Sequence, residues 1–311
     1  MNFPFVAAGK LPTRAPEQRW LIEQVWSAEA VGIIGGEPKC GKSFLALDLA
    51  VSVASGTPCL GRFPVAARGR VLLFAAEDPL DVVRVRLEGL TTARTLDLNR
   101  LPLYVITVPS LRLDSDEHRD RLADTVDKVK PALLVLDPFV RLHAIDENAA
   151  GDVAPLLAYL RQLQRTHHLA VALVHHARKD AARARPGQAL RGSSEFHAWG
   201  DSNLYLRRRE PLLRLSIEHR AAAAPDDLTL ELCAEPLTLR IADPTPITDP
   251  PAELSPAQRI EHALATATAP LGVRELRAAC RIRSETLCAT LDALTTAGRV
   301  VKSPAGYTLS R

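Results

Sequence analysis

Residues 35–50 read GGEPKCGKSFLALDLA, and from Gly36 to Ser43 they match the pattern G-x-x-x-x-G-K-S/T without a mismatch. An apolar run at 30–34 comes before the pattern and is typical of a buried strand. From Phe44 onward the apolar residues recur at helical spacing. A strand, a glycine-rich turn and a helix are the context in which this pattern cradles phosphates. The sequence therefore predicts a loop that binds the polyphosphate of ATP or GTP.

This loop offers two kinds of contact to a phosphate. Successive backbone N–H groups at the start of the helix face an anion, and the Lys42 side chain would reach the β- and γ-phosphates. The hydroxyl of Ser43 would hold Mg²⁺. The predicted nucleotide contacts are the consecutive residues Gly36, Glu37, Pro38, Lys39, Cys40, Gly41, Lys42, Ser43 and Phe44.

The composition is that of a folded protein with room for one large and one small domain. The 311 residues are 24% charged and 47% hydrophobic, and the formal net charge of +3 by itself names no partner. The five cysteines form no C-x-x-C pair, which is typical of reduced thiols in the cytoplasm. No run approaches the roughly 18 apolar residues of a membrane span, and the N-terminus lacks the apolar core of a signal peptide. We therefore expect a cytoplasmic protein without a membrane span.

Short apolar runs alternate with helical stretches along most of the chain. The candidate strands lie at 30–34, 70–76, 101–107, 132–137 and 169–176. Alternation of this kind predicts an α/β fold with a mainly parallel central sheet. Two hairpins, at 202–220 and 228–242, are expected to extend the sheet with antiparallel strands. The large domain is therefore assigned to 1–241, with a core that begins at about residue 16.

A proline-rich segment at 242–254 predicts an extended linker to a second domain at 255–311. That domain shows three short helical patterns and then a strand–turn–strand pattern, which is the order of a winged helix-turn-helix. Ser284 would begin the third helix, and Arg283 beside it would contact a major groove. Winged helices also dock onto proteins, and the sequence favours neither role.

Acidic residues end two of the predicted strands. Asp137 ends the fourth apolar run, where a carboxylate would hold Mg²⁺ through water beside the phosphate loop. Glu77 follows the second run, where it would polarise the attacking water as a catalytic base. The alternatives are local roles, with Asp137 as a buried turn cap and Glu77 as a helix cap. Asp78 is the better candidate for the helix cap, because it directly precedes Pro79.

His175 and His176 end the last of these strands, beside the expected phosphate site. One of them would distinguish ATP from ADP at the γ-phosphate, and a structural role is the alternative. The following segment is rich in alanine, glycine and cations, and repeated around a ring it would line a channel for nucleic acid. A basic surface loop is the alternative. The predicted nucleic-acid contacts are Arg178, Lys179, Arg183, Arg185 and Arg191, with Arg283 in the small domain.

Five motifs occur in order between about residues 16 and 220: GEPKCGKS, FAAEDP, VLDPFVRLHAIDENAAGD, LVHHARK and LRGSS. With these motifs the chain resembles the RecA-like ATPases of the plasmid RepA hexameric replicative helicase type. The resemblance implies a RecA-like P-loop NTPase domain, ATP and Mg²⁺ as cofactors, and a ring of six subunits with ATP bound between neighbours. It also implies that Lys42 and Ser43 bind phosphate and Mg²⁺, Glu77 is the catalytic carboxylate, Asp137 binds the metal, and the His175/His176 pair senses the γ-phosphate.

The family places basic residues on the late strands of the sheet, where they face the ATP of the next subunit. The chain departs from the family pattern at this position. Leu204 stands about where an arginine is expected. The candidates on the late strands are Arg220 and then Arg207. An arginine in this role is worth roughly 10³–10⁵ in turnover.

These features favour an ATP-hydrolysing DNA helicase or translocase that acts in the replication of a plasmid, phage or other mobile element. Single-stranded DNA would pass through the ring channel, and the winged helix would contact either duplex DNA or a protein. The alternative is an ATP-gated DNA-binding regulator without unwinding activity. A small-molecule kinase is disfavoured, because no acceptor-binding insertion is evident and Glu77 suits water activation better than phosphorylation of a hydroxyl.

Overall fold

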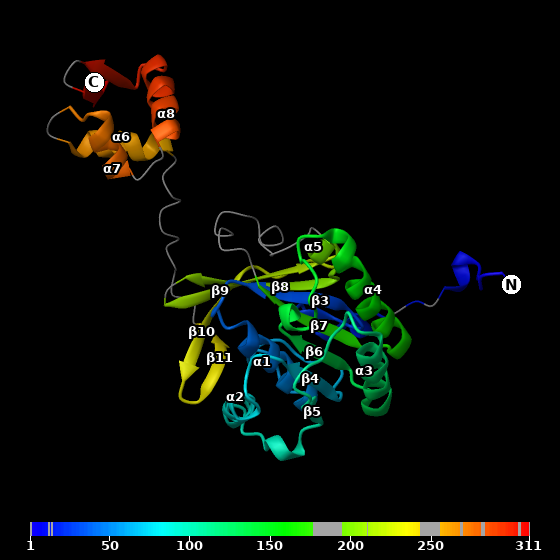
Figure 1. The fold of residues 1–311 in the computed structure, drawn as a ribbon. Coiled ribbons are helices and arrows are strands. Elements are labelled where there is room, and N and C mark those ends of the chain that lie inside the picture. The colour runs from blue at the N-terminus through cyan, green and yellow to red at the C-terminus, as the bar shows by residue number, and fades with distance from the viewer. Residues whose placement is uncertain are drawn as a thin grey trace. The chain divides into compact units, whose positions relative to one another are not determined.

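The computed structural model divides the chain into two compact units, Met1–Asp243 and Pro244–Arg311 (Figure 1). The residues that it describes are 2–11, 13, 15–176, 195–209, 211–242, 256–267, 270–280, 284–303 and 306–310. The predicted linker at 242–254 lies outside these ranges except for Ala242. Among the helices within them, none is both long enough and apolar enough to cross a membrane.

The described part of the larger unit holds a nine-stranded sheet in the order β11-β10-β9-β8-β3-β7-β6-β4-β5. Its strands are β3 (Val31–Gly36), β4 (Val71–Ala75), β5 (Leu103–Val105), β6 (Leu133–Asp137), β7 (Ala170–His176), β8 (Ser202–Arg209), β9 (Leu212–His219), β10 (Leu228–Ala234) and β11 (Leu237–Ile241). From β8 to β5 all neighbours run parallel, and β9, β10 and β11 are antiparallel additions. The predicted mainly parallel α/β sheet is confirmed. The first predicted hairpin differs in one respect, because its first strand, β8, pairs parallel with β3.

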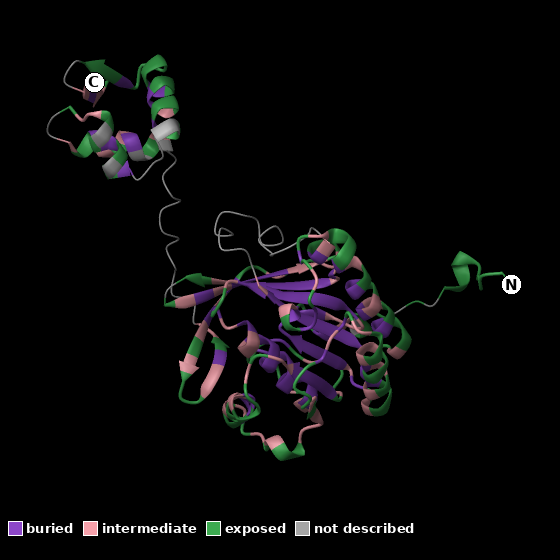
Figure 2. Ribbon diagram, viewed as in Figure 1, coloured by how far each residue is buried: buried purple, intermediate pink, exposed green. Residues whose placement is uncertain are grey.

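Helices cover both faces of this sheet (Figure 1). One face carries α1 (Lys42–Ser55) and α2 (Leu80–Thr92), and the other carries α3 (Asp116–Val129), α4 (Ala150–His167) and α5 (Glu195–Trp199). A small hairpin of β1 (Trp20–Ile22) and β2 (Trp26–Ser27) precedes β3. Parallel strands covered in this way are buried on both faces and read as continuous apolar runs. Accordingly, every residue of β3 and β6 is buried (Figure 2).

The buried side chains of the sheet form two hydrophobic clusters, one on each face. Ile34 packs with the cluster that includes α1 and α2, whereas Ile33 packs with the cluster that includes α3 and α4. Successive side chains of a strand point to opposite faces, so neighbouring residues join different cores. The ends of the strands are thereby supported from both sides.

The β10–β11 hairpin packs against α1 and α2. At Gly89 of α2, an added β-carbon would lie 2.5 Å from the carbonyl oxygen of Leu237 in β11. Glycine therefore permits the close approach of helix and hairpin. The same hairpin brings Leu232 to the end of the sheet where the phosphate loop lies.

The smaller unit has a hydrophobic core of its own. Its elements are α6 (Pro256–Thr266), α7 (Val273–Cys280), α8 (Ser284–Thr296), β12 (Val300–Ser303) and β13 (Gly306–Leu309). Ile260, Leu276, Leu287, Leu291 and Val300 are buried together in this core. β12 and β13 pair antiparallel. Whether this unit works as a winged helix-turn-helix stays a prediction.

We predict that Gly89→Ala destabilises the larger unit by about 1–3 kcal/mol, because the new methyl group forces α2 and the hairpin apart. Helix propensity alone would favour alanine by up to about 1 kcal/mol. Gly151 in α4 is the control, because a β-carbon added there would meet nothing within 4 Å. Urea unfolding of both variants measures the difference. A gain in stability for Gly89→Ala that equals the gain for Gly151→Ala would contradict the close contact.

Candidate functional site

Polar residues gather where the carboxyl ends of the parallel strands meet. Gly36 at the end of β3 lies opposite His176 of β7, and Ala75 of β4 lies opposite Asp137 of β6. Residues that follow parallel strands in this register lie side by side at one edge, where α/β proteins bind ligands. A cavity of about 310 Å³ at this edge is lined by residues 39–44 together with Ala75, Glu77, Asp78, Arg86, Asp137, His176 and Leu232. The predicted Lys42, Ser43, Glu77 and Asp137 thus meet at one cavity.

A larger cavity, of about 790 Å³, lies between the β10–β11 hairpin and the loop after α1. Two of its lining arginines are already paired, Arg94 with the buried Asp48 and Arg240 with Glu231. The smaller cavity is therefore the better candidate for chemistry, because it combines the phosphate loop with several carboxylates.

Backbone geometry shapes the phosphate loop. At Gly36 the φ angle is +156°, and an added β-carbon would lie 2.3 Å from the carbonyl oxygen of Leu206 and 2.8 Å from the Cys40 sulfur. Only glycine, which has no β-carbon, lets the backbone pass between this oxygen and this sulfur. α1 begins at Lys42, so the first N–H groups of the helix have no partner within it. The positive end of the helix dipole at this point favours an anion.

Lys42 is held inside the loop. Its ammonium donates a 2.6 Å hydrogen bond to the carbonyl oxygen of Glu37, and the residue is only 5% exposed. Burial lowers the pKa of Lys42, while the nearby Cys40, Asp137 and Glu77 favour its charged form. A buried ammonium has three donors that need acceptors. Phosphate oxygens would supply the acceptors that burial removes.

Asp137 lies beside Ser43, whose hydroxyl is hydrogen-bonded to its carboxylate. Burial raises the pKa of Asp137 to about 6. The Ser43 hydrogen bond and the Lys42 charge oppose this rise, and the carboxylates of Asp78 and Glu77 add to it. A buried carboxylate with acidic neighbours would be stabilised by a cation.

The oxygen donors at this edge fit Mg²⁺. The described ranges contain no cluster of three or more His, Cys, Asp or Glu side chains that would enclose a metal by themselves. Mg²⁺ needs no such cluster, because it usually keeps several waters and binds through one or two carboxylates and the phosphates of a substrate. Ser43 and Asp137 are the residues that would hold it.

The first two acidic residues after β4, Glu77 and Asp78, are each paired with an arginine. Glu77 Oε1 accepts a 2.8 Å hydrogen bond from Arg141 Nε. Both carboxylate oxygens of Asp78 accept from the guanidinium of Arg86, which also lies 5.1 Å over the ring centroid of Phe44. The sequence reasoning did not identify these arginines. They lie 8 and 64 positions from their partners, so no local pattern could reveal both pairs.

The predicted cap role of Asp78 is wrong. α2 begins at Leu80, with Pro79 in the N-cap position and no side chain bonded to the exposed N–H groups. The Asp78 carboxylate turns instead to Arg86, two turns into the helix. The ion pair to a guanidinium competes successfully with the weaker bond to a backbone N–H.

Of the two predicted sensor histidines, His176 lines the cavity and His175 does not. His175 is 1% exposed, and its ring stacks on Phe196 with centroids 4.3 Å apart. Its ring also meets Phe139 edge-on at 5.9 Å. Because successive residues of a strand point to opposite faces, only one of a consecutive pair can face the cavity. Of the pair, His176 is therefore the better placed to meet a γ-phosphate, and the sensor role stays a prediction.

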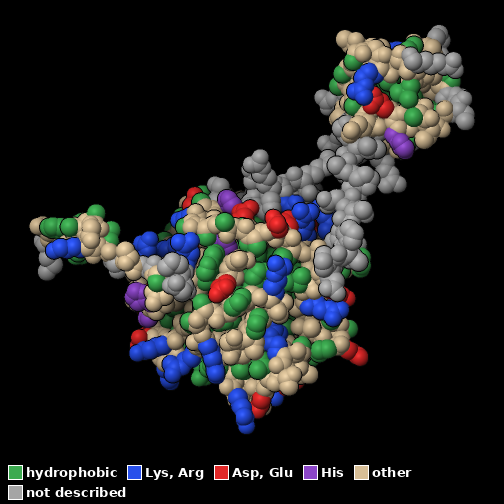
Figure 3. All heavy atoms as spheres, turned by 180° about the vertical axis from the view of Figure 1, so that it is seen from behind, with side chains coloured by type: hydrophobic (Ala, Val, Ile, Leu, Met, Phe, Trp, Pro, Cys, Tyr) green, Lys and Arg blue, Asp and Glu red, His purple; other side chains and the backbone are tan. Residues whose placement is uncertain are grey.

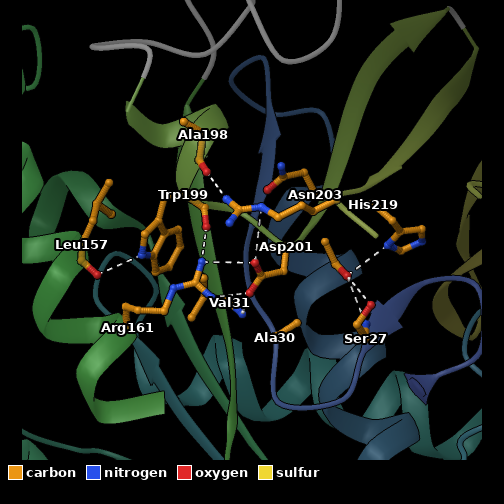
Figure 4. Close-up of polar contacts among 12 residues, drawn as sticks. Ser27, Ala30, Val31, Leu157, Arg161, Ala198, Trp199, Asp201, Asn203 and His219 are labelled. Carbon is orange, nitrogen blue, oxygen red and sulfur yellow. Dashed lines mark hydrogen bonds and ion pairs between the residues drawn. The ribbon is translucent and has the colours of Figure 1, made fainter. Parts of the chain in front are cut away.

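Arg207 lies near the end of β8 and Arg220 follows the end of β9, and because these two strands are antiparallel the two arginines lie at opposite edges of the sheet. Arg207 lies at the end near the phosphate loop, where burial lowers its pKa and the Glu37 carboxylate partly offsets the change. Arg220 lies at the other end, where its guanidinium contacts the carbonyl oxygen of Ala198 and the carboxylate of Asp201 (Figure 4).

Asp201 is the centre of a polar junction at that end of the sheet (Figure 4). Its carboxylate accepts hydrogen bonds from two guanidinium nitrogens of Arg161 in α4 and from the Val31 N–H at the start of β3. Arg220, which directly follows β9, also contacts the Asp201 carboxylate of its own chain. A role for either Arg207 or Arg220 at the ATP of a neighbouring subunit stays a prediction.

The predicted nucleic-acid contacts lie outside the described residues: Arg178, Lys179, Arg183, Arg185, Arg191 and Arg283. On the face of the larger unit seen in Figure 3, Lys and Arg side chains are scattered among neutral and acidic ones. The side chains drawn on that face therefore form no single basic track. The nucleic-acid interface stays a prediction.

A phosphate loop between a buried parallel strand and a helix, with carboxylates after two neighbouring strands, defines a P-loop ATPase of the RecA-like class. The fold agrees with this class. A solved structure of an ATPase domain matches with a TM-score of 0.53 at 13% identity, over 70% of this chain and 87% of that chain. By sequence, the chain belongs to the AAA domain family AAA_25, whose model matches residues 1–182.

Similar proteins include DNA repair proteins named RadA. Those of Streptococcus pyogenes serotype M6 and serotype M1 are each 25% identical over 158 residues. This match covers 50% of the present chain and 29% of each RadA protein. The chain therefore spans less than a third of the length of these relatives.

We predict that Asp137→Asn stabilises the nucleotide-free protein above about pH 6. The carboxyl group has a pKa of about 6 in the folded chain and 3.8 in the reference state, so folding disfavours its charged form. The resulting loss in the free energy of unfolding is negligible below about pH 4, where the group is protonated in both states, and grows to about 1–3 kcal/mol above about pH 6. The asparagine amide avoids this charge.

Urea unfolding at about pH 4.5 and about pH 8, with divalent metal chelated, measures this prediction. The variant should gain more over wild type at the higher pH. A stability difference that is the same at both pH values would show that Asp137 is not held in a disfavoured charged form.

Proposed function

We propose that the chain is an ATP-driven DNA helicase or translocase that works in the cytoplasm as a ring, preferably a hexamer. The observation that carries this proposal is the convergence of Lys42, Ser43, Glu77 and Asp137 on one cavity at the strand ends. The proposed setting is the replication of a plasmid, phage or other mobile element. The resemblance of the motifs to plasmid RepA-type helicases supports this setting.

In the proposed mechanism the β- and γ-phosphates of ATP lie in the phosphate loop. Lys42 exchanges the Glu37 carbonyl oxygen, now 2.6 Å from its ammonium, for phosphate oxygens. Ser43 and Asp137 would hold Mg²⁺, which when bound would supply positive charge that offsets the charge of the phosphates. Because Asp137 is buried among acidic groups, its carboxylate would be stabilised by a cation at this position.

Glu77 is the proposed base for hydrolysis. Its side chain is 41% exposed and lines the cavity, so water has access to it. A carboxylate that orients and polarises the attacking water contributes roughly 10²–10⁴-fold to the rate. His176, which lines the same cavity, is the proposed sensor of the γ-phosphate.

A neighbouring subunit is proposed to complete the site with an arginine. Such a residue stabilises the charge of the transferring phosphoryl group and is worth roughly 10³–10⁵ in turnover. For Arg220 this role requires the guanidinium to leave Asp201 of its own chain. Arg220 and then Arg207 stay the proposed candidates.

DNA is the proposed partner. Single-stranded DNA would contact the cations between 178 and 191 in the ring channel, and the smaller unit would contact duplex DNA. The relatives described above are named DNA repair proteins, which supports a DNA substrate.

An ATP-gated DNA-binding regulator is the second candidate function, and the smaller unit favours it. On α8, Leu287 and Leu291 are buried in the core of that unit while Thr286 is exposed. A helix that is anchored on one face and exposed on the other is the way in which helix-turn-helix domains present a recognition helix. Docking onto a protein uses the same geometry.

We predict that Lys42→Ala lowers ATP affinity and turnover together, whereas Glu77→Gln keeps ATP affinity within about threefold and loses hydrolysis by about 10²–10⁴-fold. The first variant loses a phosphate contact, and the second loses only the base. Titration with a fluorescent ATP analogue and phosphate release measure the two effects. Lys128→Ala, an exposed position on α3, is the control. Normal turnover in Glu77→Gln would show that another group is the base.

The test of the proposed function is ATP turnover titrated with single- and double-stranded DNA, together with strand displacement on a forked duplex. A motor predicts turnover that rises at least about tenfold with single-stranded DNA, and displacement that requires ATP. Tight duplex binding with slow, unstimulated turnover would contradict the motor and support the regulator.

A further inference from the structure

The ion pair between Glu77 and Arg141 borders the cavity. Arg141 ends the short helical turn η4 (Phe139–Arg141), which follows β6 after Pro138. Its Nε atom donates to Glu77 Oε1 at 2.8 Å. Glu77 is among the described residues that line the cavity, and Arg141 is not. The guanidinium therefore holds the carboxylate from outside the cavity.

The turn η4 is a firm base for Arg141. Phe139 is fully buried, and the centroid of its ring lies 4.3 Å from that of His143 and 5.2 Å from that of Phe196. The Arg141 N–H donates to the carbonyl oxygen of Pro138 at 3.1 Å. The backbone that carries Arg141 is thus fixed by packing and hydrogen bonding, while its side chain is 61% exposed.

Glu77, in contrast, lies two residues beyond the end of β4 with a partly exposed side chain. A glutamate in such a position has several staggered rotamers of similar energy. The charge-assisted hydrogen bond from Arg141 selects one of them. Within the described part of the chain, no hydrogen bond is made to the other carboxylate oxygen, Oε2, which leaves it available to a water molecule.

We propose that Arg141 is a positioning residue for Glu77. It holds Oε1 so that Oε2 faces the water that attacks the γ-phosphate. This inference rests on the proposed hydrolytic role of Glu77. Arg141 contacts neither the nucleotide nor the water and acts through the carboxylate alone.

The loss of Arg141 should lower the rate of hydrolysis far more than it lowers stability. Exposed ion pairs contribute little to folding, because solvent screens them and ordering two side chains has an entropic cost. A misplacement of about 1 Å at a reacting group, however, can lower a rate about 100-fold. The two effects are therefore separable by experiment.

The test compares Arg141→Ala with Arg84→Ala. Arg84 on α2 makes the same atom pair, Nε to Oε1 of Glu88, at 2.7 Å and with similar exposure, and it does not line the cavity. Arg141→Ala should lower kcat about 10- to 100-fold and change KM for ATP by less than about threefold. Arg84→Ala should leave both unchanged. The thermal midpoints of both variants should stay within about 2 °C of wild type.

Two further variants distinguish positioning from a general structural role. Arg141→Lys keeps the charge and should recover kcat to within about tenfold of wild type. In the Glu77→Gln background, Arg141→Ala should lower the residual turnover by less than about twofold, because its effect passes through the carboxylate that is already absent.

Three outcomes would overturn the inference. An unchanged kcat in Arg141→Ala would show that Glu77 needs no such support, and a raised kcat would show that the ion pair restrains the base. A full additional loss in the double variant would show that Arg141 acts independently of Glu77. Failure of the proposed function would look different, because Glu77→Gln would then hydrolyse ATP normally.

Discussion

A buried ammonium and a buried carboxylate at one edge of a parallel sheet are the constraint on which the rest of the site depends. Lys42 starts α1 and Asp137 ends β6, and they are 5% and 8% exposed. Burial disfavours the charged form of both, so that it lowers the pKa of the lysine and raises the pKa of the aspartate. The strand order β3-β7-β6 keeps them close. A triphosphate with its cation offers the lysine acceptors and the aspartate a positive charge.

The two cores of the larger unit support this edge from opposite faces. Arg86 extends from α2, which packs into one core, and it pairs with Asp78. Arg141 extends from η4, whose Phe139 packs into the other core, and it pairs with Glu77. The acidic residues that leave β4 are therefore held from both sides of the sheet. Lys42 and Asp137, the proposed binding groups, are buried at this site. The proposed base, Glu77, is partly exposed, and its role requires contact with water.

The sequence predicted those parts of the fold and site that depend on local patterns. The phosphate loop, Glu77 and Asp137 follow continuous apolar runs, and parallel strands bring such positions to one edge. Properties set by side-chain direction were not predictable in the same way. His175 turns into the core because of strand alternation, and the ion pairs of Arg86 and Arg141 join residues that only the folded chain brings together. The parallel pairing of β8 likewise depends on where the chain re-enters the sheet after β7.

The most direct measurement is a crystal structure of the protein with Mg²⁺ and a non-hydrolysable ATP analogue. The Lys42 ammonium should leave the Glu37 carbonyl oxygen for the β- and γ-phosphates, with Mg²⁺ between Ser43 and Asp137 and the Glu77 carboxylate facing the γ-phosphate across a water molecule. A nucleotide bound elsewhere, or a Lys42 still bonded to Glu37 with the phosphates in place, would contradict a single site shared by these groups.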